Sequence, residues 1–327
     1  MRFKLLLYLI FVGVLFSFIA NYYTTSQLSD AVTLLYVAWG EQDGELGRND
    51  GYGPRSFSID EHESIYFADW VQCKVKRFSK GELIWSVETP TPPEDLAVDS
   101  KLGVVVACRN GIVITLCPDT GQTLGSFSLR ERTEDESASG VQRLLINGGQ
   151  IYIADYWVSS EGHVMRLAVY ATDGRMLRVL AYRKIEPWGQ QRGLEGTIPG
   201  SYDDFFILPS GEIYLADGNR IFRYSQGLKQ EDSFDIPIDG ALRIAGILGN
   251  DRLVVTSSVE QTTNVYRIRR GQEPALDVRV ANDFRGRSHV AMRGSSLYIL
   301  ENQVDGLSVK KYSYVSAMRR FIGTLFK

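Results

Sequence analysis

The chain has 327 residues, of which 44% are hydrophobic, and a formal net charge of −3. This length and apolar content suffice for a large buried core and exclude a mostly disordered chain. The small negative charge argues against a dedicated nucleic-acid-binding protein, whose affinity would come from neutralising phosphates.

The N-terminus predicts an export signal. Arg2 and Lys4 precede an unbroken apolar run at residues 5–20. As a helix this run would span roughly 24 Å, a little less than the ~30 Å hydrocarbon core of a bilayer, and Tyr22 and Tyr23 could extend it at the interface. We therefore expect a transmembrane signal anchor at residues 1–23, followed by a short linker at 24–31.

Cleavage of this leader is the alternative. A signal peptidase site needs small residues, but Phe18 occupies the position three residues before the best cut, after Ala20. An uncleaved anchor is therefore favoured. Because a positive flank stays in the cytoplasm, the rest of the chain is expected outside it, as a single-pass protein of the cell membrane. A cleaved leader would make the protein secreted or periplasmic.

A short phrase recurs six times along the chain. Its copies are IYFAD at 65–69, VVVAC at 104–108, IYIAD at 151–155, IYLAD at 213–217, LVVTS at 253–257 and LYILE at 297–301. Each copy follows an apolar segment with a tight turn, and it precedes an alternating strand, a glycine-containing turn and a fourth apolar strand. Four short antiparallel strands per unit predict an all-β, six-bladed β-propeller over residues 32–314.

The sixth unit lacks a fourth strand before the chain ends. Residues 32–40, VTLLYVAWG, form an extra strand-like segment without a unit of its own. We expect this segment to complete the last blade, so that an N-terminal strand closes the ring without leaving an open edge. The rival assignment uses the C-terminal tail as the closing strand. Otherwise the tail, residues 315–327, is expected to be a basic amphipathic helix.

The first unit resembles an NHL repeat. Residues 53–82, GPRSFSIDEHESIYFADWVQCKVKRFSKGE, contain a proline-led first strand, an acidic turn, an IYFAD strand and a strand that ends before a glycine turn. The preceding WGEQDGELG, at 39–47, is similar to the lead-in of such repeats. The resemblance implies a six-bladed protein of a group that mostly binds other molecules and includes some enzymes.

Three aspartates end copies of the repeated strand: Asp69, Asp155 and Asp217. A recurring carboxylate suggests catalysis, but an aspartate that ends a strand commonly bonds the amides of the next turn. We expect this capping role. The three cysteines, Cys73, Cys108 and Cys117, leave at least one thiol unpaired and are expected to be small core residues, with no metal-type spacing.

The strand order places nearly all the long loops on one face of the ring. These loops join second to third strands and fourth strands to the next blade, and they are expected at 40–53, 129–140, 156–163, 181–204, 257–264 and 282–287. Long loops in a compact repeat protein usually have a function. We therefore expect this long-loop face to bind a protein or a small ligand.

The insertion at 182–204 is the first candidate site on this face. Three aromatic residues could supply rigid contact area and three basic residues could supply charge, the mixture found at interaction hot spots: Tyr182, Trp188, Tyr202, Arg183, Lys184 and Arg192. The alternative is that Trp188 only fixes the loop onto the propeller.

The mouth of the central channel is the second candidate site. The residues that open each first strand are Arg55 and Ser56, Glu94 and Asp95, Gln142 and Arg143, Asp203 and Asp204, Arg243, and Arg287 with His289. The arginines of this ring are candidate binding residues for an anion. Glu94, Asp95, Asp203 and Asp204 are an alternative site for a divalent cation; otherwise no cofactor is expected.

An enzyme is the alternative to a binding module. Enzymes of the gluconolactonase-like propeller family place a carboxylate and Asn or Asp ligands for a divalent cation at this position, but this chain offers no asparagine at these openings. Streptogramin-lyase-like propellers use a histidine, and His289 is the candidate general base here. The alternative function is therefore a cation-dependent hydrolase or lyase at the channel mouth.

Overall fold

The structure is a computed structural model that describes residues 26–49, 52–129, 138–160, 162–185, 191–193, 203–248, 252–259, 262–281 and 289–316. The expected signal anchor at 1–23 and most of the expected tail at 315–327 lie outside these residues. Within the described ranges, no helix is both long enough and apolar enough to cross a membrane. The domain boundaries stay predictions.

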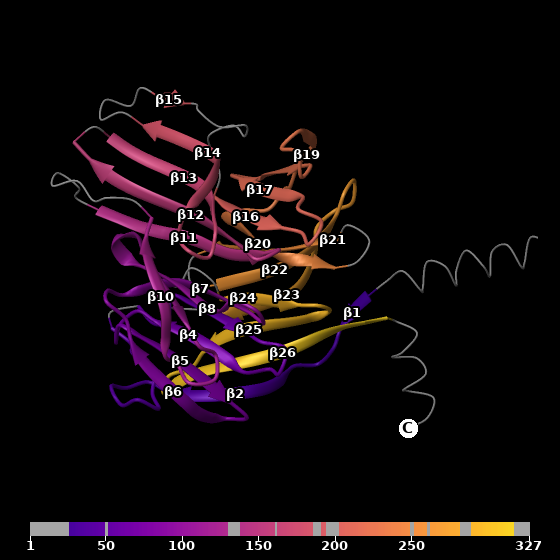
Figure 1. The fold of residues 1–327 in the computed structure, drawn as a ribbon. Helices are drawn as coiled ribbons and strands as arrows, with labels where there is room; N and C mark the ends of the chain where they lie inside the picture. The colour runs from indigo at the N-terminus through magenta and orange to yellow at the C-terminus, as the bar shows by residue number, and fades with distance from the viewer. Residues whose placement is uncertain are drawn as a thin grey trace, which may run out of the picture.

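The described residues form six antiparallel sheets, one per blade (Figure 1). Blade 1 comprises β3 (Ser56–Ile59), β4 (Ile65–Asp69), β5 (Lys74–Ser79) and β6 (Glu82–Glu88). Blade 2 comprises β7 (Pro93–Asp99), β8 (Gly103–Cys108), β9 (Ile112–Leu116) and β10 (Thr123–Ser128), with the short 3-10 helix η1 (Arg109–Gly111) between β8 and β9. Blade 3 comprises β11 (Ala138–Asn147), β12 (Gln150–Ser159), β13 (Gly162–Tyr170), β14 (Met176–Ile185) and β15 (Gln191–Gly193).

The other three blades follow the same plan. Blade 4 comprises β16 (Asp204–Ile207), β17 (Ile213–Asp217), β18 (Arg220–Tyr224) and β19 (Gln230–Asp235), and blade 5 comprises β20 (Ala241–Leu248), β21 (Arg252–Val259), β22 (Thr262–Arg269) and β23 (Ala275–Ala281). Blade 6 comprises β24 (Val290–Arg293), β25 (Ser296–Asn302), β26 (Gly306–Ser316), β2 (Val32–Ala38) and β1 (Ser26–Leu28). The first strands contact one another in sequence around the ring, and β24 contacts β3. The predicted six-bladed propeller is confirmed.

The repeated phrase fills the cores between blades because its side chains alternate between the two faces of a strand. In β4, Ile65 and Phe67 pack in a core shared with blade 6, whereas Tyr66 and Ala68 pack in a core shared with blade 2. All four side chains are buried. The same strand thus joins two neighbours, which explains why each unit needs an uninterrupted apolar second strand.

The N-terminal strand closes the ring. β2 pairs antiparallel with β26, with Tyr36 opposite Ser308, and its Leu35 and Val37 are buried in the core between blades 6 and 1. This confirms closure by residues 32–40 rather than by the tail. β1, which lies in the segment expected to be a linker, continues the same outer strand by pairing with Tyr314–Ser316 of β26.

Two of the expected long loops are strands instead. The 156–163 loop is the paired ends of β12 and β13, and the 257–264 loop is the paired ends of β21 and β22. Aromatic and β-branched residues such as Trp157, Val158 and Thr262 extend the pairing there, because they suit a half-buried pleated surface. Each hairpin therefore projects beyond the ring as a sheet rather than as a loop.

Candidate functional site

The six first strands place one polar side chain each at the same level of the channel. Each lies opposite the fourth residue of the repeated phrase in its second strand. The six are Ser56, Asp95, Arg143, Asp204, Arg243 and His289. This is the level that the sequence register predicted. We call these six residues the channel ring.

Two aspartates of the channel ring link consecutive blades. Asp95 Oδ1 accepts a hydrogen bond from Ser56 Oγ of blade 1, and Asp95 Oδ2 accepts one from the amide of Leu144 in blade 3 at 2.7 Å. Burial raises the pKa of the Asp95 carboxyl, and the charge of Arg143 opposes this shift.

Asp204 repeats the pattern two blades further on. Its Oδ2 accepts a hydrogen bond from the amide of Ile244 in blade 5 at 2.8 Å, and its Oδ1 lies 3.7 Å from Arg143 Nε of blade 3. Arg143 also donates to the carbonyl of Ile244 at 3.3 Å. One buried cluster therefore connects three blades.

The remaining two carboxylates of the metal hypothesis also bond backbone amides. Glu94 accepts from Val141 N, and Gly140 permits this approach because a Cβ there would lie 2.4 Å from Glu94 Oε2. Asp203 accepts from Gly218 N at 2.8 Å. Within the described ranges, no group of three or more His, Cys, Asp or Glu residues is arranged to hold a metal ion. Glu94 thus joins blade 2 to blade 3, whereas the bond of Asp203 lies within blade 4.

His289 is a poor general base in this environment. Its Nε2 atom is inaccessible to solvent, and burial together with the charge of Arg243 lowers the pKa of His289 to about 3. An efficient base has a pKa near the working pH. Of the other predicted channel arginines, Arg55 lies over the ring of Trp70 at 5.7 Å, and Arg287 lies outside the described residues.

The predicted insertion site is partly a strand. Tyr182, Arg183 and Lys184 belong to β14, opposite Arg166, Met165 and Val164 of β13, because the sheet of blade 3 continues past the ring. This corrects their expected place in a loop. Arg192 lies in β15 opposite Lys184, and only its backbone is described. Trp188 and Tyr202 lie outside the described residues.

Blade 3 carries a rigid aromatic and charged cluster on this extension. Arg166 forms two hydrogen bonds to the carboxylate of Asp155, at 3.0 and 2.8 Å, and both side chains are buried. The guanidinium also lies 5.3 Å from the Trp157 ring, which contacts Tyr182 at 6.5 Å between ring centroids. Asp155 therefore pairs with an arginine across the strand instead of capping a turn as expected.

A pocket of about 840 Å³ lies on the long-loop face, where blade 6 meets blade 1. We call it the closure pocket. Its lining includes Trp39, Arg48, Asn49, Gln72, Lys74 and Val304. Trp39 Nε1 donates to the carbonyl of Gln303 at 3.1 Å, and Arg48 lies over the Trp39 ring at 5.5 Å. Val304 is 97% exposed beside it. The pocket thus combines an aromatic wall, a stacked cation and an apolar rim.

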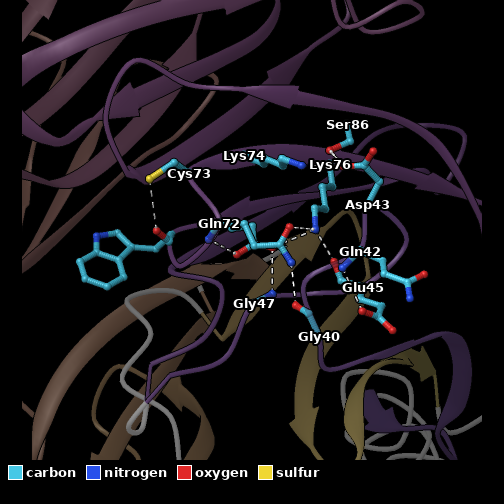
Figure 2. A network of polar contacts seen from close by, with 12 residues as sticks. Gly40, Gln42, Asp43, Glu45, Gly47, Gln72, Cys73, Lys74, Lys76 and Ser86 are labelled. Carbon is cyan, nitrogen blue, oxygen red and sulfur yellow. Dashed lines mark hydrogen bonds and ion pairs between the residues drawn. The ribbon is translucent and has the colours of Figure 1, made fainter.

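A buried ion pair lies next to residues that line the pocket, and Figure 2 shows its lysine, Lys76, close to Gln72 and Glu45. Asp69 Oδ2 and Lys76 Nζ are 3.1 Å apart, and both side chains are fully buried. Lys76 also donates to Gln72 Oε1 at 2.8 Å and to the carbonyl of Glu45, and burial lowers the pKa of Lys76 despite the charge of Asp69. These bonds hold the loop after β2 against blade 1.

Asp69 also fixes backbone on both sides of the pocket. It accepts hydrogen bonds from the amides of Gln72, at 3.2 Å, and Gly47, at 3.0 Å. The bond to Gln72 confirms the expected turn-capping role, but the ion pair with Lys76 was not predicted. The sequence did contain a signal for this ion pair. Lys76 lies opposite the apolar Phe67 and therefore on a buried face of the sheet, where a charged side chain needs a partner.

No protein-family model matches the chain, and no curated protein matches it significantly. Solved propellers do resemble it. The WD40 repeats of RRP9 are 12% identical with a TM-score of 0.56, and the match covers 89% of this chain and 100% of that one. A luciferin-regenerating enzyme is 13% identical with a TM-score of 0.52, covering 80% and 91%. Virginiamycin B lyase from Staphylococcus aureus is 13% identical with a TM-score of 0.50, covering 89% and 100%. At such identities the similarity shows the propeller fold alone, so the NHL resemblance stays a prediction.

Proposed function

We propose that the chain is an NHL-like binding module, anchored in the membrane and exposed outside the cytoplasm, that binds a protein partner through its long-loop face. The closure pocket is the observation that carries this proposal. Tryptophan and arginine are the residues most enriched at interaction hot spots, and here Arg48 is stacked on Trp39.

The rigidity of the pocket supports the same function. Lys76 and Asp69 fix the loop that carries Trp39 and Arg48, and Gln72 Nε2 donates to the carbonyl of Gly40 at 2.7 Å. A surface that is already ordered loses less conformational entropy when a partner binds. The aromatic cluster of blade 3 offers a second ordered contact area on the same face.

The channel ring favours a binding module over a hydrolase or lyase. Backbone amides already donate hydrogen bonds to four carboxylates at the channel mouth: Glu94, Asp95, Asp203 and Asp204. A cation bound there would compete with these hydrogen bonds. Such amide bonds stabilise the ionised carboxylate, and those of Glu94, Asp95 and Asp204 join neighbouring blades. The carboxylates of Glu94, Asp95 and Asp204 are therefore accounted for by their role in assembling the propeller.

Site-specific photo-crosslinking tests this function. A photoreactive residue at Val304, which is 97% exposed beside the pocket, is expected to capture a partner in native membranes. The same residue at Leu124, which is 61% exposed on the outer strand of blade 2, is the matched control. Arg48→Ala is expected to reduce capture through Val304 at least tenfold without lowering the melting temperature, because Arg48 is an exposed residue. Equal capture at both positions, or capture unaffected by Arg48→Ala, would contradict the proposal.

A further inference from the structure

A second pocket lies on blade 5, on the side that faces blade 4. Its volume is about 450 Å³, and it is lined by the loop between the two blades, by the end of β21, by β22, and by β23 with the turn before it. Tyr266 of β22 packs in the core that the two blades share, and Asn264 lies on the same face two residues earlier. We call this pocket the blade 5 groove.

The loop between blades 4 and 5 forms one wall of the groove and is held by both blades. Ile236 and Ile238 are buried in the core between these blades, and the amide of Ile236 donates to the carbonyl of Asn219 at 2.7 Å. Ser257 Oγ, near the end of β21, donates to the carbonyl of Asp239. Asp239, which lines the groove, therefore belongs to an ordered segment.

Asn264 and Arg279 form a polar pair inside the groove. They lie directly opposite each other in β22 and β23, and Asn264 Oδ1 accepts a hydrogen bond from Arg279 Nε at 2.9 Å. Asn264 is only 7% exposed, so this bond fixes the position of the guanidinium. Within the described ranges, no acceptor engages the amide nitrogen of Asn264 or the two terminal nitrogens of Arg279. These N–H groups are donors that suit the two oxygens of a carboxylate.

Acidic side chains lie toward the two ends of the groove. Asp239 is near the end of β21, where β22 begins, and Glu273 is in the turn after β22. In the part of the chain that the structure describes, neither carboxylate forms an ion pair, and Arg270, in the same turn as Glu273, pairs with Asp232 at 3.1 Å instead. The groove thus presents an acid, the guanidinium of Arg279 and a second acid in this order. From Glu273 to Arg279 an extended strand covers roughly 20 Å.

The strand beside the groove has an open edge. β23 is the last strand of the blade 5 sheet: it pairs with β22 on one edge, and no described strand pairs with its other edge. The backbone N–H and C=O groups of an open edge can bind an extended peptide as an additional strand. Every second side chain of that strand would lie on the face of the groove, beside Arg279. An open edge next to charges spread over roughly 20 Å favours a peptide over a compact small molecule.

We propose that the blade 5 groove binds an extended peptide segment that adds to the edge of β23. An acidic side chain of the segment lies against Arg279 and Asn264, and basic side chains on either side of it face Asp239 and Glu273. Backbone hydrogen bonds supply the affinity, and the order of charges supplies the selectivity. The site depends neither on the closure pocket nor on membrane anchoring.

Fluorescence anisotropy of the full chain with two labelled peptides tests this site. One is a nine-residue peptide in which lysine alternates with alanine and occupies both ends, and the other is the same peptide with glutamate as its central residue. The glutamate peptide is expected to bind at least about fivefold more tightly, because only its central side chain complements Arg279. The net charge of −3 acts in the opposite direction, since it favours the all-lysine peptide.

Substitutions at Arg279 locate the preference in the groove. Arg279→Glu is expected to reverse it, because a carboxylate there repels glutamate and attracts lysine, and the milder Arg279→Gln should abolish it. Arg279 is exposed, so neither change should lower the melting temperature. Arg178→Glu is the matched control: it replaces an exposed arginine of another fourth strand, β14 of blade 3, and should leave the preference intact.

Four results would overturn the inference. They are equal or tighter binding of the all-lysine peptide by the unmodified chain, no binding of either peptide at millimolar concentration, an unchanged preference in Arg279→Glu, and loss of the preference in Arg178→Glu. Partner capture through Val304 involves none of these residues and therefore tests the proposed function separately. Loss of that capture with the peptide preference intact would refute the closure pocket and leave the blade 5 groove standing.

Discussion

Replacing Lys76 by methionine is expected to lower the free energy of unfolding by about 3–5 kcal/mol. The ammonium group and the carboxylate of Asp69 are both fully buried and 3.1 Å apart, so the variant leaves Asp69 as a buried charge without its counter-ion. It also releases the carbonyl of Glu45 and so loosens the loop that forms one wall of the closure pocket. Urea denaturation at neutral pH measures the loss.

Lys74→Met is the matched control. Lys74 lies two residues away on the same strand and pairs with Asp43 at 2.6 Å, but that carboxylate is largely exposed to solvent. Exposed ion pairs contribute about 0–1 kcal/mol because water screens them. The control should therefore lose under about 1 kcal/mol. A loss of similar size in the two variants would show that burial of the Lys76 pair has no special importance.

Acidification from pH 7 to pH 5 is expected to cost the fold about 2 kcal/mol through His289 alone. The pKa of His289 is lowered to about 3 in the folded chain, whereas an unfolded histidine takes up a proton below about pH 6.5. Falling pH therefore favours the unfolded state across this window, at about 1.4 kcal/mol per pH unit once below pH 6.5. Denaturation curves at the two pH values measure the loss.

His289→Gln separates this contribution from those of other groups. The variant cannot take up a proton, so its stability should change about 2 kcal/mol less between pH 7 and pH 5 than that of the unmodified chain. Most carboxylates titrate below this interval and contribute equally to both proteins. An identical pH dependence in the two proteins would mean that His289 does not remain neutral in the folded state.

The alternating strands were predictable because burial between blades imposes a period of two on each of them. Tyr66 and Ile65, for example, must enter different cores, and only apolar residues at both positions satisfy this requirement. Closure was also predictable, because the sixth unit lacked one strand and residues 32–40 had no other place. Both inferences depend on the local pattern of apolar residues and on the number of strands in each unit.

The site was less predictable because it depends on contacts between distant segments. Trp39 bonds the carbonyl of Gln303, far along the chain, so nothing local to either residue indicates a pocket there. The strands of blade 3 were expected to end near Asp155, since aspartate is typical of turns. The pairing of Asp155 with Arg166 allows an aspartate inside the sheet, and the strands continue to Ser159 and Ile185.

Closure by β2 is the claim on which the pocket depends, because this strand positions Trp39 and the loop that carries Arg48. A disulfide tests it most directly: Tyr36→Cys with Ser308→Cys places two thiols opposite each other across β2 and β26. Mild oxidation and peptide mapping are expected to show a bond between positions 36 and 308, with a higher melting temperature than the reduced form. Failure of these two thiols to join, while the chain remains folded, would contradict closure by the N-terminal strand.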